Sequence, residues 1–206
     1  MSFPDKSYAA AGEYLCAYRD EIVRGWQSLD IAVLDRAAAM LDAVITGGQT
    51  IYACGNGGSA AIANHLLCDF LKGIQTDTKL RPRVVSLASH LELITAIAND
   101  ISYAEVFAFQ LRTLAVPGDV LMTISASGNS ENIVRAVAWA REHGVHTIAL
   151  TGFAGGRSAA LAEINLHVEA ENYGVVEDIH QSLMHLLSQY LRQRAMPPDL
   201  IPQRKF

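Results

Sequence analysis

One segment of the chain gathers hydroxyl groups at a place suited to bind an anion. Ser125 to Ser130 reads Ser-Ala-Ser-Gly-Asn-Ser, between an apolar, strand-like run and a helix-patterned stretch. The N-terminus of a helix attracts anions through its unpaired N–H groups and its dipole. A serine that only caps the helix is the alternative. The hydroxyls of Ser125, Ser127 and Ser130 exceed what a tight turn requires, so we predict a phosphate site.

A second segment, Gly55-Asn-Gly-Gly-Ser, follows the strand-like run 50–54. Its glycines permit positive φ and close approach of a ligand, while Asn56 and Ser59 offer polar contacts. Ligands of parallel sheets bind beyond the carboxyl ends of the strands, so the two segments could face one pocket. A purely structural glycine turn is the alternative. The segment lacks the lysine of a P-loop and the glycine spacing of a dinucleotide site, which argues against nucleotide binding.

Histidines paired with acids form a second set of candidates. His65 and Asp69 are four residues apart, on one face of the helix expected after the glycine segment. Such a pair could share a divalent metal or act as acid and base, or it could simply cap or solvate the helix. In the closing helix, a helical wheel favours Asp178 over Glu177 as the partner of His185. Both acids could equally be stabilisers of a first helical turn.

The elements that must position these residues alternate between helix and strand. Strands are expected at 50–54, 83–87, 119–124, 146–150 and 164–168, and helices at 8–24, 30–45, 60–71, 91–98, 103–114, 131–142, 157–162 and 177–194. This alternation predicts right-handed crossovers and an α/β fold, a doubly wound sheet of about five parallel strands covered on both faces. We expect one domain over 1–206, with a leading helical segment 1–46 and an extended tail 197–206.

Composition limits the function further. The chain has 206 residues, half of them apolar, which is enough for one sizeable core. A net charge of −5 without a basic stripe gives no support for nucleic-acid binding. No apolar run approaches the roughly 18 residues of a membrane span, and no leader pattern is present. Three cysteines without metal spacing suit a reducing compartment. We expect a soluble, cytoplasmic protein.

Together these motifs resemble those of the sugar isomerase (SIS) domain, and more closely those of the phosphoheptose isomerases, which act on sedoheptulose 7-phosphate. The resemblance rests on Gly55-Asn-Gly-Gly-Ser, His65 with an acid four residues on, Ala98-Asn-Asp, the strand entering Ser125-Ala-Ser-Gly-Asn-Ser, Leu150-Thr-Gly and the helix with His185. The motifs follow the family's order and cover nearly the whole chain.

The resemblance implies a five-stranded parallel sheet, a homotetramer with active sites at subunit interfaces, and ketose-to-aldose interconversion through an enediol. It implies substrate contacts from Asn56, Gly57, Gly58, Ser59, Asn99, Asp100, Ser125, Ala126, Ser127, Ser130 and Glu177. It also implies a zinc ion held by His65, Asp69, Glu177 and His185. Asp69 would be the catalytic base and His185 the acid. Because the resemblance groups Glu177 with His185, it overrules the helical-wheel preference for Asp178.

Two positions depart from the family's pattern, because Asp69 stands where the family has glutamate and Glu177 where it has glutamine. Both remain oxygen ligands, so the zinc site stays chemically sound, while the choice of sugar is left open. Two other functions fit the fold. One is a non-catalytic SIS protein that binds the replication initiator DnaA; SIS proteins of this kind share the stretch 96–100. The other is a sugar-phosphate sensor. The presence of both Asp69 and His185 favours the isomerase.

Overall fold

The computed structural model describes residues 3–206 and is built around one parallel sheet. The strands are β1 (Thr50–Gly55), β2 (Arg83–Ser86), β3 (Val120–Ser125), β4 (His146–Thr151) and β5 (Ile164–His167). Their order is β2-β1-β3-β4-β5, and every neighbouring pair is parallel. This confirms the predicted doubly wound α/β fold. The order reverses between β1 and β3, which is where open parallel sheets bind ligands.

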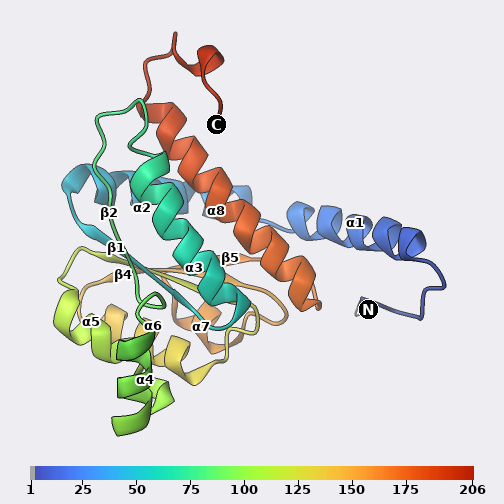
Figure 1. Ribbon diagram of the computed structural model, residues 1–206, viewed down its shortest axis with the longest axis horizontal. Helices are drawn as coiled ribbons and strands as arrows, with labels where there is room; N and C mark the ends of the chain where they lie inside the picture. The colour runs from blue at the N-terminus through green and yellow to red at the C-terminus, as the bar shows by residue number, and fades with distance from the viewer. Residues whose placement is uncertain (1–2) are drawn as a thin grey trace.

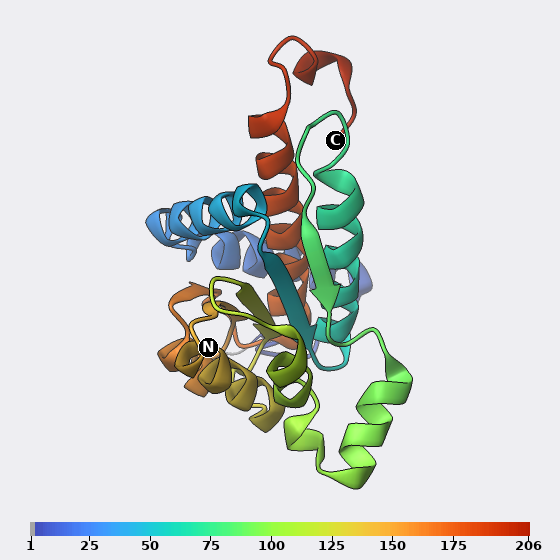
Figure 2. The same ribbon diagram turned by 90° about the vertical axis from the view of Figure 1, so that its left-hand side faces the viewer.

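Helices cover both faces of the sheet (Figures 1 and 2). They are α1 (Ala11–Gln27), α2 (Ile31–Gly47), α3 (Gly58–Cys68), α4 (Leu91–Asp100), α5 (Ala108–Leu114), α6 (Glu131–Glu142), α7 (Gly156–Leu161) and α8 (Tyr173–Ala195). Single turns of 3-10 helix occupy Tyr103–Glu105 and Ile201–Gln203, and a π-helical turn occupies Asp69–Gly73. In the part of the chain that the structure describes, no helix is both long and apolar enough to cross a membrane.

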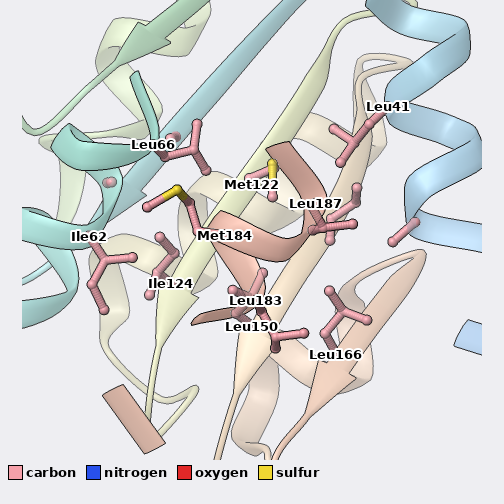
Figure 3. Close-up of a cluster of buried hydrophobic side chains, with 14 of the residues drawn as sticks. Leu41, Ile62, Leu66, Met122, Ile124, Leu150, Leu166, Leu183, Met184 and Leu187 are labelled. Carbon is pink, nitrogen blue, oxygen red and sulfur yellow. The ribbon is translucent and has the colours of Figure 1, made fainter. Parts of the chain in front are cut away.

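Two hydrophobic cores hold these layers together, because successive strand residues point to opposite faces. On one face, Ile51 and Ala53 of β1 pack with α2, α3 and α8. Figure 3 shows this core, with Leu66 of α3 and Leu183 of α8 around the strands. On the other face, Tyr52 of β1 packs with α5 and α6. The first core fixes α3 and α8 side by side, and these two helices carry most of the candidate titratable residues (Figure 1).

Two predicted helices start more than three residues away from where the structure has them. The helix expected at 103–114 is divided into a 3-10 turn and α5. The closing helix begins at Tyr173 instead of Glu177, since the Asn172 side chain accepts a hydrogen bond from the Val175 N–H and caps it. Of the leading segment 1–46, residues 1–2 lie outside the described residues.

The tail 197–206, predicted to be extended, folds back instead. It contains the 3-10 turn Ile201–Gln203. The buried Arg192 of α8 donates to the carbonyl oxygen of Lys205 at 3.2 Å, and its guanidinium lies 4.7 Å from the centre of the Phe206 ring. Arg192 therefore holds the tail against α8, and the local sequence pattern does not predict this contact.

Candidate active site

The serine segment lines a small cavity at the switch point of the sheet. The cavity has a volume of about 140 Å³ and is lined by Asn56, Ser59, Ile124, Ser125, Ala126, Ser127, Ser130, Tyr173 and Glu177. Ser125 ends β3, and Ser130 occupies the N-cap position of α6. The Ser130 hydroxyl makes no capping hydrogen bond within the described chain. Its hydroxyl is thus available to a ligand, which weakens the alternative that this serine serves only as a helix cap.

The glycine segment reaches the same cavity, as its position after β1 predicts. Asn56 exchanges amide hydrogen bonds with Asn132 of α6 at 3.0 and 2.8 Å. Tyr103 also donates its hydroxyl to Asn56 Oδ1 at 2.9 Å. Gly57 has a φ of +54°, a conformation that L side chains rarely adopt, and occupies the N-cap position of α3. The Asn56 side chain is therefore held in a fixed orientation at the edge of the serine cavity.

Asn99 and Asp100, also predicted to contact substrate, stand at the end of α4. The Asn99 side-chain amide donates to Asp100 Oδ1 at 2.8 Å, and neither residue lines the serine cavity. Tyr103, three residues beyond Asp100, joins this region to Asn56. Their predicted role as substrate contacts stays a prediction.

The second cluster forms where the end of α3 faces the middle of α8. Potential ligand atoms of His65, Asp69 and His185 all lie within 4.8 Å of one another. Asp69 Oδ2 is 2.7 Å from His185 Nδ1, and Asp69 Oδ1 is 3.4 Å from His65 Nε2. Asp69 also begins the π-helical turn, a distortion that occurs frequently at functional sites. A carboxylate held between two imidazoles can ligate a metal or transfer protons.

Asp178, the residue favoured by the helical wheel, has a different partner. It accepts a hydrogen bond of 2.6 Å from the hydroxyl of Tyr18, on α1. The wheel preference is wrong because the partner of His185 comes from another helix, which a single-helix projection cannot represent. The idea of a first-turn stabiliser also fails for both Glu177 and Asp178, since α8 starts at Tyr173.

Glu177 is separated from the three-residue cluster and faces the serine cavity instead. Its carboxylate lies over Gly58, at a place where any side chain on residue 58 would collide with it. Burial raises the pKa of Glu177, and the negative charge of Asp178 raises it further. Of the four predicted metal ligands, the structure thus brings together His65, Asp69 and His185, and places Glu177 with the candidate phosphate site.

A sequence model of the SIS domain matches residues 16–152. The chain is 35% identical to a probable phosphoheptose isomerase of Thermoplasma acidophilum over 170 residues, which cover 82% of this chain and 93% of that protein. It is 40% identical to a phosphoheptose isomerase of Nitratidesulfovibrio vulgaris over 155 residues, 75% of this chain and 74% of that protein. The chain belongs to the phosphoheptose isomerase family of SIS-domain proteins.

Solved structures agree with this family. The phosphoheptose isomerase of Neisseria gonorrhoeae superposes with a TM-score of 0.80 at 33% identity, covering 88% of this chain and 98% of that one. The family membership confirms the resemblance inferred from the sequence motifs. The SIS-domain match ends at residue 152, before α8, so it does not include Glu177 or His185. The roles of Glu177 and His185 are therefore assigned from the geometry of the site.

One residue of this phosphoheptose isomerase site escaped the sequence analysis. Gln181 lies on α8 between Glu177 and His185, one helical turn from each. Its side-chain Nε2 is 3.1 Å from His65 Nδ1 and 3.0 Å from His185 Nε2. The spacing of four residues before His185 was the signal that could have identified it.

Proposed function

We propose that this member of the family isomerises sedoheptulose 7-phosphate to glycero-manno-heptose 7-phosphate, through an enediol. The observation that carries the proposal is the 2.7 Å contact between Asp69 and His185, on the pair of helices that also reaches the serine cavity. The relatives are phosphoheptose isomerases, which indicates the reaction, and this contact provides an acid and a base for it.

The serine cavity would anchor the phosphate. Hydroxyls and backbone N–H groups at the start of α6 can bind phosphate oxygens without a lysine or arginine in the cavity lining. The contacts assigned to the sugar and its phosphate are Asn56, Gly57, Gly58, Ser59, Asn99, Asp100, Ser125, Ala126, Ser127, Ser130 and Glu177. Binding energy gained at the phosphate would position the reacting carbons at the other end of the sugar.

Asp69 and His185 would carry the proton transfers. The Asp69 carboxylate removes the proton from the carbon next to the carbonyl, and His185 donates a proton to the carbonyl oxygen, which gives a neutral enediol. Asp69 then returns its proton to the other carbon while His185 recovers one from the neighbouring hydroxyl. The short contact between Asp69 and His185 orients the imidazole for this exchange.

The donor set at this cluster fits zinc, because two imidazoles and a carboxylate are within reach of one ion. We assign the ion to His65, Asp69 and His185, each of which would offer one atom, so that the second carboxylate oxygen of Asp69 and the second ring nitrogen of His185 stay available for proton transfer. When bound, zinc would polarise the sugar oxygens as a Lewis acid. Glu177, the fourth ligand implied by the family resemblance, faces the serine cavity, so we assign it a contact with the substrate.

The proposal includes a homotetramer, as the family resemblance implies. A groove of about 650 Å³, lined partly by Trp26, Leu186 and Tyr190, runs beside His185 and would place a neighbouring subunit next to the active site. Light scattering on the purified protein should give four times the mass of the chain. We also place the enzyme in the cytoplasm, since Cys16, Cys54 and Cys68 are all free thiols, which suits a reducing compartment.

Purified, zinc-loaded protein should convert sedoheptulose 7-phosphate in a coupled or chromatographic assay. Asp69→Asn and His185→Asn should each lower kcat by roughly 100-fold to 10,000-fold, the usual contribution of general acid–base catalysis. Asp178→Asn is the matched control, because it removes another acid of α8, one that contacts Tyr18 instead of the cluster. An unchanged substrate across a pH series would overturn the substrate assignment.

The alternative functions lack a use for this pair of residues. A sugar isomerase domain from an RpiR transcription factor of Sphaerobacter thermophilus shares the fold, with a TM-score of 0.65 at 19% identity. The fold alone therefore does not separate an enzyme from a sensor or a DnaA-binding protein. Neither of these requires a carboxylate in contact with two histidines. We therefore retain the isomerase as the single proposal.

A further inference from the structure

The imidazoles of His65 and His185 are flanked on two sides by different polar groups. On one side, both rings face the carboxylate of Asp69, His185 at 2.7 Å and His65 at 3.4 Å. On the other side, both rings face the amide nitrogen of Gln181, at 3.0 and 3.1 Å. Gln181 is half-buried on α8. The four side chains therefore form a closed ring of polar contacts.

The positions of the protons in this ring follow from the chemistry of its members. An ionised carboxylate only accepts hydrogen bonds, so His185 Nδ1 must carry the hydrogen of its 2.7 Å bond to Asp69. If His65 Nδ1 accepts from Gln181, the hydrogen of His65 lies on Nε2, which is 3.4 Å from Asp69. A neutral imidazole has one donor and one acceptor, which leaves His185 Nε2 and His65 Nδ1 as acceptors. These two nitrogens face the amide nitrogen of Gln181, whose NH₂ group has two hydrogens. Three of the four contacts in the ring are thus hydrogen bonds, and the fourth is the 3.4 Å ion-pair contact between His65 and Asp69.

The same amide suits the metal-loaded form, which rests on the zinc assignment proposed above. A cation held between Asp69 and the facing ring nitrogens would displace the two protons from that side. Each ligating ring would then carry its N–H on the opposite side, where metal-bound histidines need an acceptor. The amide of Gln181, turned over, offers an oxygen with two lone pairs. A carboxylate at position 181 could serve only this second form, and an aliphatic side chain neither.

We propose that Gln181 is a positioning residue that fixes the orientation of His65 and His185 in both the metal-free and the metal-loaded enzyme. Glu177 does not take this role, because its carboxylate faces Gly58 and the serine cavity one helical turn earlier. The ring of contacts assigns to Gln181 a function at the centre that the family's motifs do not assign.

The metal-free form is tested by nitrogen-15 NMR of the histidine rings in wild-type protein treated with a chelator. The unprotonated nitrogens should be His65 Nδ1 and His185 Nε2, and the protonated ones should be their ring partners. A proton on either nitrogen facing Gln181 would overturn the proposal. This measurement requires neither turnover nor metal, so it stands even if the enzyme acts on another sugar.

The metal-loaded form is tested by calorimetric titration of zinc into wild type, Gln181→Leu, Gln181→Glu and the control Gln27→Leu, at the exposed end of α1. Gln181→Leu should weaken zinc binding 10-fold to 100-fold, the usual effect of removing a partner of a metal-bound histidine. Gln181→Glu should bind zinc at least as tightly as wild type, because it keeps the acceptor. Gln27→Leu should leave the affinity unchanged.

The opposite order of the two variants would contradict the proposal. If Gln181 only fills space, leucine should preserve zinc affinity and glutamate should not. Wild-type protein that binds no zinc would overturn the metal assignment in the proposed function, and the NMR measurement would then decide the role of Gln181 alone. Circular dichroism of each variant identifies any that fails to fold, in which case the wild-type spectra and the remaining variant give the answer.

Discussion

Asp69 and His185 are separated by 116 residues and meet through a single contact of 2.7 Å. Sequence spacing predicts which residues share one helix face, so it could relate His65 to Asp69 and Gln181 to His185. It could not predict that α3 and α8 face each other, and for this reason the wheel selected Asp178. The correct partner came only from the family resemblance. A residue's place on a helix is local information, whereas its partner is decided by packing.

The Glu177 side chain places a carboxyl group in a cavity otherwise suited to phosphate. Two unit charges about 4 Å apart repel by about 1 kcal/mol in water, so Glu177→Gln should lower KM about fivefold with little effect on kcat. Because burial and Asp178 raise the pKa of Glu177, its carboxyl stays neutral to higher pH than usual. The difference in KM should therefore widen as pH rises. Steady-state kinetics at several pH values measure it, and equal KM values throughout would contradict the assignment.

His180 is a buried titratable side chain that the proposed mechanism does not use. Its Nε2 lies 3.2 Å from the carbonyl oxygen of Thr151, and burial lowers the pKa of His180 to about 4. The unfolded chain therefore binds this proton first as pH falls from about 6.5. Stability from neutral His180 should be complete above that pH and should decrease by about 3 kcal/mol as pH falls to about 4.

The variant His180→Gln keeps an N–H group without a charge that titrates in this range. Urea unfolding at several pH values should show a smaller loss of unfolding free energy in the variant than in wild type between pH 6.5 and 4. Parallel losses in the two proteins would show that other groups control the acid sensitivity.

At the scale of elements, the serine segment depends on a close approach between two loops. Gly128 has a φ of +62°, and a Cβ there would collide with the carbonyl oxygen of Gly155. The Ser158 N–H also donates to the Gly128 carbonyl oxygen at 2.9 Å. The loop after β3 is thus held against the loop after β4. The sequence predicts a tight turn at Gly128, but the second loop that makes glycine necessary belongs to the tertiary structure.

Gly128→Ala should therefore damage both the loop and phosphate binding. Strain at a positive φ together with the backbone collision should cost about 2 kcal/mol or more of unfolding free energy, and KM should rise with it. Gly12→Ala is the matched control, since a Cβ at Gly12 in the first turn of α1 meets nothing within 4 Å. Alanine should be neutral or stabilising there. Thermal melts and kinetics of both variants check this, and equal behaviour would show that the close approach is unimportant.

At the scale of the molecule, the alternation of strands and helices was enough to predict the sheet, its parallel strands and its two covered faces. The boundary errors have physical causes. The start of α8 depends on the Asn172 cap, and the folded tail depends on Arg192, which contacts residues more than ten positions away. Hydrophobic periodicity indicates which face of a segment is buried, but it does not predict single polar contacts between segments. The site could be predicted as two separate motifs, and only the fold relates them.

The distance between those two motifs predicts the length of the sugar. Glu177 at the serine cavity and His185 at the catalytic pair are eight residues apart on α8, or about 12 Å along the helix axis. With C–C bonds of about 1.5 Å, an extended seven-carbon sugar with a terminal phosphate spans roughly 10 Å, which is close to that separation.

A five-carbon ketose 5-phosphate is shorter by roughly 2 to 3 Å, since it lacks two C–C bonds. With its phosphate in the serine cavity, its reacting carbons would fall short of Asp69 and His185. Because misplacement by about 1 Å can lower a rate 100-fold, kcat/KM for the shorter sugar should be at least 100-fold lower than for sedoheptulose 7-phosphate. The two sugars can be compared in one assay with the same zinc-loaded preparation. Equal values would mean that phosphate is not anchored at the serine cavity while the chemistry proceeds.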